Sequence, residues 1–134
     1  MTSNTIQTLN SNFAIIRSKG DQALFSRTTA QMKVIYKIKD TKPLADFMPT
    51  ILLKAKDFAT EITIHNAREN NMSSENQISN EHITNNTAVR ETLLSRGIIP
   101  EKLLPEEDVK KVQRKLNTES KKALKNIPKL KKED

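Results

Sequence analysis

The sequence has no cysteine and only two glycines among its 134 residues. The lack of cysteine excludes disulfides and thiolate metal sites, and two glycines are too few for most glycine-rich catalytic loops. The sequence contains none of the patterns GxxxxGK[ST], GxSxG, HExxH or GxGxxG, which mark common nucleotide-binding, hydrolase and metalloprotease sites. We therefore interpret the chain as a protein without catalytic activity, cofactor or bound metal.

Apolar and aromatic residues are also scarce, at 35% and 4% of the chain, which predicts a modest core. The first residues, MTSNTIQTLNSN, lack the basic start and long apolar run of a secretory signal. The longest apolar run, TILLKA, is far shorter than the roughly 20 residues that a membrane span requires. We expect a cytoplasmic protein with no membrane contact.

The positive charge is concentrated at the end of the chain. The sequence has 23 basic and 16 acidic residues, and residues 110–134 hold ten of the basic and three of the acidic ones. Residues 1–109 therefore carry no net charge, and the whole excess of +7 lies in the last part. A neutral body with a basic end is typical of nucleic-acid contact and also of a solvated tail.

Apolar residues recur mostly at helical spacing, which predicts an all-α fold with about five helices. We expect a single small domain over residues 12–116, a mobile polar segment over 1–11 and a basic, partly flexible tail over 117–134. A first helix over 12–20 would end at Gly20. A second would begin after Thr28 or Thr29 and place Met32, Ile35 and Tyr36 on one face.

The strongest helical pattern covers about residues 50–68 and predicts the central helix of the core. Its apolar stripe, widened by Leu52, has the spacing i, i+4, i+7, i+8, i+11. The stripe consists of Ile51, Ala55, Phe58, Ala59 and Ile62.

Residues 69–80 are polar and predict a loop. The next helix would begin after Ser79 or Asn80 and end at Gly97, followed by an extended link over 98–104. A last helix would begin at Pro105, with acidic residues 106–108 in its first turn. Its narrow stripe of Val109, Val112 and Leu116 is compatible with self-association.

Several segments in succession resemble the C-terminal half of the bacterial DNA-damage-inducible protein D family. The segments IRSKGDQALF, KPLADFMPTILLKAKDFATEITIHN and NQISNEHITNNTAVRETLLSRGIIPEKLLPEEDVKKVQRKL carry this resemblance, which covers roughly residues 13–125. Many members have glycines after the pair that corresponds to Leu24 and Phe25, where this chain has Ser26 and Arg27, so we expect a different loop there. Members are about twice as long, so we expect a truncated member, a split gene product or a fragment.

The resemblance implies a role in the DNA-damage (SOS) response. It also implies binding to the recombinase RecA, or to its filament on single-stranded DNA, and restraint of that filament. No catalytic activity or cofactor comes with the family.

The basic end supplies candidate phosphate contacts, which give affinity independent of base sequence. The alternative is a solvated helix face, because no aromatic residue lies among them to stack on bases. The candidates are Lys110, Lys111, Arg114, Lys115, Lys121, Lys122 and Lys125.

Two arginines, Arg90 and Arg96, are candidate contacts to a protein partner, because guanidinium groups bind carboxylates and phosphates through paired hydrogen bonds. The alternative for both is ion pairing on the protein's own surface. Asp57, Glu61 and His65 have the i, i+4, i+8 spacing of one helix face, which we interpret as a solvated polar face and not a metal site. His82 is interpreted as a lone solvated histidine in a loop or at the start of a helix, and not as a metal ligand.

Three functions remain open. The first is an interaction protein that binds RecA in damage-response regulation. The second is a nucleic-acid-binding module that acts through the basic end, and the third is a scaffold or dimerisation element.

Overall fold

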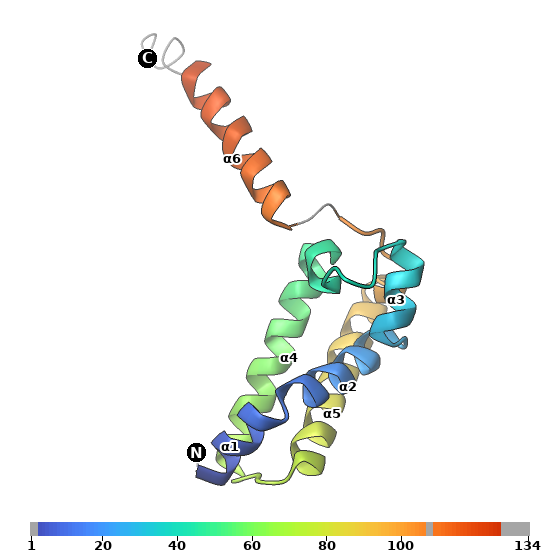
Figure 1. Ribbon diagram of the computed structural model, residues 1–134, viewed down its shortest axis with the longest axis vertical. Coiled ribbons are helices and arrows are strands. Elements are labelled where there is room, and N and C mark those ends of the chain that lie inside the picture. Colours follow the sequence, from blue (N-terminus) through green and yellow to red (C-terminus); the bar gives the residue numbers. More distant parts are fainter. Residues whose placement is uncertain (1–2, 107–108, 127–134) are drawn as a thin grey trace.

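The computed structural model describes residues 3–106 and 109–126 of the chain (Figure 1). Within these residues the fold is all-α, as predicted, with six α-helices, two short 3-10 helices and no strand. The α-helices are α1 (Ser3–Ser11), α2 (Phe13–Phe25), α3 (Thr29–Tyr36), α4 (Thr50–Glu69), α5 (Glu75–Ser95) and α6 (Val109–Asn126). The 3-10 helices are η1 (Leu44–Phe47) and η2 (Pro100–Lys102). None of the described helices is long and apolar enough to cross a membrane.

The central helix is α5, which packs against both α2 and α4. The prediction that α4 lies at the centre is therefore wrong. The apolar pattern of α5 is weak, because four of its buried residues are polar: Ser79, His82, Asn85 and Asn86. A central position that is built from polar side chains gives little of the periodic signal by which a core helix is found in a sequence.

Helix α4 has nearly the predicted bounds, but it buries a different face. Its buried residues are Leu52, Ala55, Ala59, Thr63 and Ala67. Phe58 is 64% exposed and Ile51 is 43% exposed, so the prediction that these two belong to the core is wrong. Small side chains on the buried face allow α4 to approach α5 closely, and the bulky Phe58 lies on the outer side.

Helix α2 continues through Gly20 to Phe25, so the prediction that Gly20 ends this helix is wrong. The helix ends at Ser26, which adopts the left-handed conformation with φ 55° and ψ 24°. Gly20 lies instead at the contact with α5, and it is buried. Leu24 and Phe25 at the end of α2 are fully buried in the main core cluster.

Replacing Ser26 by glycine is expected to stabilise the protein. A side chain in the left-handed conformation costs about 1–2 kcal/mol, while glycine adds unfolded-state freedom worth about 0.4–1 kcal/mol. The net expectation is a gain of a few tenths to about 1 kcal/mol in the free energy of unfolding, measured by denaturant titration. Arg27→Gly is the control and should lower stability, since φ at Arg27 is not positive; equal effects of the two changes would contradict this explanation.

The helix boundaries test the predicted caps. The side chain of Thr28 caps α3 together with Gln31, and Gly97 has the positive φ of 79° that was expected after α5. Helix α5, however, begins earlier than predicted, because Ser74 and Gln77 form its capping box. Ser79 is buried inside the helix, and residues 75–80 are therefore not a loop.

The first residues form a helix where a mobile segment was predicted. The Thr5 hydroxyl in α1 donates to the Met72 carbonyl at 2.5 Å, and the Thr8 hydroxyl donates to the Ser73 carbonyl. These bonds attach α1 to the connection between α4 and α5, far away in the sequence. The threonine hydroxyls of α1 therefore bind backbone carbonyls of this connection, which explains why a polar helix packs there.

The link after α5 contains η2 and an extended stretch, and α6 begins at Val109. Pro105 is not helical, so the prediction that it starts the last helix is wrong. The backbone N–H of Glu106 instead donates to the Phe47 carbonyl at 2.9 Å, which holds the chain against η1. Glu107, Asp108 and tail residues 127–134 lie outside the described residues.

Candidate functional site

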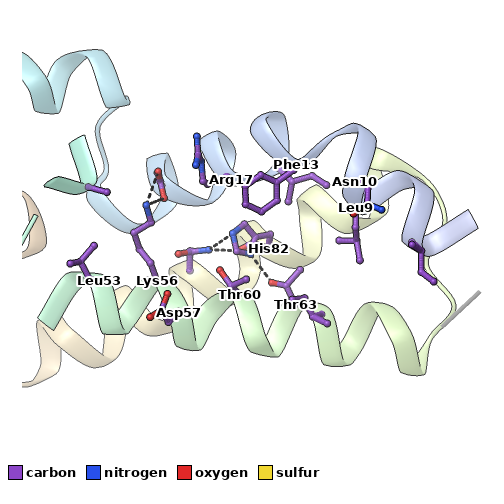
Figure 2. Close-up of a pocket in the computed structure, with 16 residues that line it drawn as sticks. Leu9, Asn10, Phe13, Arg17, Leu53, Lys56, Asp57, Thr60, Thr63 and His82 are labelled. Atoms are coloured by element: carbon purple, nitrogen blue, oxygen red, sulfur yellow. Dashed lines mark hydrogen bonds and ion pairs between the residues drawn. The ribbon is translucent and has the colours of Figure 1, made fainter. Parts of the chain in front are cut away.

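A groove of about 610 Å³ runs between the arm formed by α1 and α2 and helix α4, with α5 at its floor (Figure 2). We call it the α5 groove. Its apolar lining comes from both walls: Ile6, Leu9, Phe13, Ile16, Leu53 and Ile64. Helices α2 and α4 both pack on α5, and the space between them is bridged by the ion pair between Lys56 and Asp21.

A buried polar network centred on Thr63 forms the floor of the α5 groove. The Thr63 hydroxyl donates to the Ala59 carbonyl at 2.9 Å, so its oxygen is left to accept from Asn85 at 3.0 Å and from His82 Nδ1 at 2.7 Å. On the other side of the ring, Asn86 Nδ2 lies 3.3 Å from His82 Nε2. These partners fit a neutral imidazole with its proton on Nδ1.

An ion pair between Lys56 and Asp21 connects α4 to α2 beside this network (Figure 2). Lys56 Nζ lies 3.1 Å from Asp21 Oδ1 and 3.2 Å from Oδ2. Both side chains are largely covered, with 19% and 10% of their surfaces exposed. Burial lowers the pKa of His82, the nearby Asp21 charge raises it, and Lys56 lowers it further.

The buried His82 should make the protein less stable in mild acid. Its pKa in the folded state lies below the ordinary value of 6.5, so its contribution is fully present above that pH and is lost as pH falls through the folded pKa. The free energy of unfolding is expected to decrease between about pH 7 and pH 5.5, measured by urea titration at each pH. His82→Gln should remove this decrease.

The exposed His65 on α4 gives the matched control, since it is the only other histidine in the chain. His65→Gln should keep the full dependence on pH. If His65→Gln flattens the pH profile and His82→Gln does not, the assignment to His82 is wrong.

His82 is therefore not the solvated residue that the sequence suggested, since only 6% of its surface is exposed. Asp57, Glu61 and His65 are exposed on α4, as expected for a solvated face. The described residues contain no group of three side chains that could hold a metal ion.

Arg90 is committed to contacts inside the domain. Its Nη1 and Nη2 donate to the two carboxylate oxygens of Glu101 at 2.6 and 2.9 Å, and Nη1 also donates to the Leu24 carbonyl at 2.9 Å. Hydrogen bonding to Arg90 lowers the pKa of Glu101, and the same bond raises the pKa of Arg90. The structure thus gives Arg90 the ion-pairing role that was the alternative to partner binding.

Removing the Arg90 side chain should lower stability more than removing Arg96. The Arg90 and Glu101 side chains are 17% and 13% exposed, so Arg90→Ala leaves a nearly buried carboxylate and a carbonyl without their donor. We expect a loss of about 1–2 kcal/mol in the free energy of unfolding, discounted for the remaining solvent. Arg96→Ala should cost less than about 0.5 kcal/mol, and equal costs by thermal or urea unfolding would contradict the assignment.

Arg96 lies at the C-terminal end of α5 and is exposed. It makes no ion pair within the described part of the chain. Of the two predicted partner contacts, Arg96 is therefore the one whose side chain is presented to solvent.

The predicted phosphate contacts all fall within the bounds of α6. Lys121 and Lys122 are exposed. The side chains of the other five lie outside those that the structure describes: Lys110, Lys111, Arg114, Lys115 and Lys125. The predicted phosphate contacts and Arg90 therefore lie on different elements, since Arg90 is in α5 and bonds to the Leu24 carbonyl of α2.

Sequence reasoning did not find the α5 groove. The available signal was the presence of Thr63, His82 and Asn86 at helix positions that line up with apolar ones. Such polar residues on an inward face indicate a buried network, but they do not show which helix faces them.

In a comparison with protein families, the model of the DinD C-terminal domain matches residues 3–112. The matched region contains α1 to α5, the α5 groove and Arg90. Most of α6 follows the matched region, including five of the seven predicted phosphate contacts. Curated proteins and solved structures gave no match.

Proposed function

Because the chain belongs to the DinD family through its C-terminal domain, a DNA-damage-inducible family, we propose that it is a non-catalytic domain that binds RecA or its filament on single-stranded DNA. In this role it works in the cytoplasm and restrains RecA filaments during the SOS response. The observation that carries the proposal is the family match over nearly the whole body of the protein.

The charge distribution supports a protein partner for the body. Residues 1–109 carry no net charge, so this part of the chain has no general attraction for a phosphate backbone. It presents several partly exposed apolar side chains outside the α5 groove, including Phe58, Ile35 and Ile51. Exposed apolar and aromatic groups of this kind favour contact with protein.

The test is co-sedimentation with RecA filaments assembled on single-stranded DNA. We expect the full chain to pellet with the filaments, and the variant Lys121→Glu/Lys122→Glu to do so nearly as well. The two lysines are exposed, so these changes leave the fold intact. A chain that stays in the supernatant, with and without DNA, would overturn the proposal.

A second candidate function is direct binding of nucleic acid by α6. At about 100° per residue, the positions of the seven basic candidates fall on one side of this helix, within an arc of about 140°. A helix with one continuous basic side is suited to a phosphate backbone. The lysines that the structure describes there, Lys121 and Lys122, are exposed.

The salt dependence of binding separates the two functions. Each phosphate contact with a single strand contributes about 0.7 to the slope of log affinity against log salt. If α6 binds DNA directly, the loss of two contacts in Lys121→Glu/Lys122→Glu should make the magnitude of this slope smaller by about 1.4. Deletion of residues 117–134 should abolish binding. RecA binding through the body should survive both changes.

A further inference from the structure

We propose that α6 of one copy docks into the α5 groove of a second copy, so that the protein forms a two-fold symmetric dimer with exchanged α6 helices. The proposal rests on the groove and on α6, and it does not depend on the proposed function.

The α5 groove has the shape that a fourth helix requires. Helices α2 and α4 both pack on α5, and the fourth position of a helical bundle lies above the Lys56–Asp21 ion pair that bridges them. On α4 the groove is lined by Leu53, Thr60 and Ile64, whose spacing of i, i+7, i+11 makes one line of about 16 Å. On the opposite wall, Phe13 is 55% exposed and Ile6 is 45% exposed. A helix laid between these walls would cover both.

Helix α6 has the apolar surface that would fill this groove. Leu116 and Leu124 are 51% and 60% exposed, and Ala123 is exposed beside them. Among the elements that the structure describes, α6 packs appreciably against η1 alone. Its 18 residues span about 27 Å, enough to cover the line from Leu53 to Ile64. An amphipathic helix of this kind gains most of its stability by packing its apolar face.

The charges at the groove determine which side of α6 faces inward. Lys56 pairs with Asp21 across the groove, and the other charged lining residues, Arg17 and Asp57, are of opposite sign, so the groove has no excess of negative charge to attract the basic side of α6. The apolar side therefore enters the groove, and the basic positions remain in solvent. Docking in this way leaves the exposed Lys121 and Lys122 available for other contacts.

The position of α6 favours a second copy over its own groove. The bond from the Glu106 N–H to the Phe47 carbonyl holds the chain at the η1 end of the body, where Ala45 also lines the end of the groove. From there α6 extends away from the body, opposite to α1 (Figure 1). A two-fold axis near the start of α6 places each α6 along the groove of the other copy, which is the usual geometry of a swapped dimer.

Mixed single-cysteine variants test the exchange directly, because the chain has no cysteine of its own. Thr60→Cys places a thiol in the groove, and Leu124→Cys places one on α6, in a chain that carries a mass tag. A short bis-maleimide should give a covalent heterodimer of these two variants. The matched control, Phe58→Cys with tagged Leu124→Cys, should give little, since Phe58 lies on the exposed side of α4 and does not line the groove.

Light scattering of the full chain gives the second readout. We expect a mass approaching twice 15.2 kDa with rising concentration, and a dimer dissociation constant at least about tenfold higher in Phe13→Asp and in Leu124→Asp. Phe58→Asp should change the constant by less than about twofold. Phe13, Phe58 and Leu124 are each more than half exposed, so we expect the variants at these three positions to fold.

Three results would overturn the proposal. The first is a monomer at every concentration, and the second is a dimer that Phe13→Asp and Leu124→Asp leave unchanged. The third is cross-linking between positions 60 and 124 only within one chain of a double-cysteine variant, which would place α6 in its own groove.

Discussion

Phe25→Ala is expected to lower the free energy of unfolding by about 3–5 kcal/mol, the usual cost of removing a buried phenylalanine side chain. Phe25 is fully buried and lies in the core cluster with Leu24, Met32 and Met48. It is the last residue of α2, so its ring joins this helix to the residues around η1. Alanine would leave a cavity that the surrounding helices can close only in part. Urea titration monitored by circular dichroism measures the loss.

Phe58→Ala is the matched control on α4. Because 64% of Phe58 is exposed, its removal should cost less than about 1 kcal/mol. The sequence pattern alone predicts the opposite order, since Phe58 lies in the apolar stripe of the strongest helix. A larger loss at Phe58 than at Phe25 would contradict the packing described here.

Gly20→Ala is expected to destabilise the protein by about 2 kcal/mol, although alanine is the better helix former. A Cβ at this position would lie 2.3 Å from His82 Cδ2 and 2.5 Å from His82 Nε2. The imidazole cannot move away easily, because it is buried and bonded to Thr63. Overpacking of this kind costs about 1–3 kcal/mol or somewhat more, which outweighs the gain of about 1 kcal/mol in helix propensity.

A double-mutant cycle with His82→Ala gives the sharpest form of this experiment. Once the imidazole is removed, the nearest remaining atom is Asn86 Nδ2 at 2.8 Å, at the end of a side chain that can shift into the space the ring has left. Gly20→Ala should then become neutral or stabilising, and the sign change measures the coupling between α2 and α5. If Gly20→Ala stabilises the unmodified protein, the close contact between these helices is not present in solution.

The features that sequence reasoning predicted correctly are those fixed by local chemistry. Thr28 caps α3 through its own side chain, and Gly97 takes the left-handed conformation that follows α5. The extent of α4 follows from its long helical pattern. Each of these depends on residues within a few positions in the sequence, so a single chain is enough to find them.

The features that sequence reasoning missed are those fixed by contacts between distant residues. Ser79 was interpreted as a possible cap, but it is buried because α5 begins at the Ser74 capping box and continues into the core. Gly20 was interpreted as a helix end, but its role depends on His82, 62 positions later in the sequence. Polar residues that are buried for such reasons look like surface residues in the sequence.

Of the candidate site, the sequence predicted individual charged residues but not the groove that the fold creates. For Arg90 the sequence left two roles open, contact to a protein partner and ion pairing within the protein, and the structure supplies an ion-pair partner, Glu101 in η2. The charge of α6 was evident from the sequence. The α5 groove was not, because its lining residues come from α1, α2, α4 and α5, which only the tertiary fold brings together.

The most direct test of the proposed function is fluorescence anisotropy of labelled single-stranded DNA at low and moderate salt, with and without RecA. If the body binds RecA, the protein changes the anisotropy of RecA-coated DNA at moderate salt and leaves the anisotropy of bare DNA nearly unchanged there. A change with bare DNA that disappears as salt rises, and no further effect when RecA is present, would contradict it and assign the activity to α6.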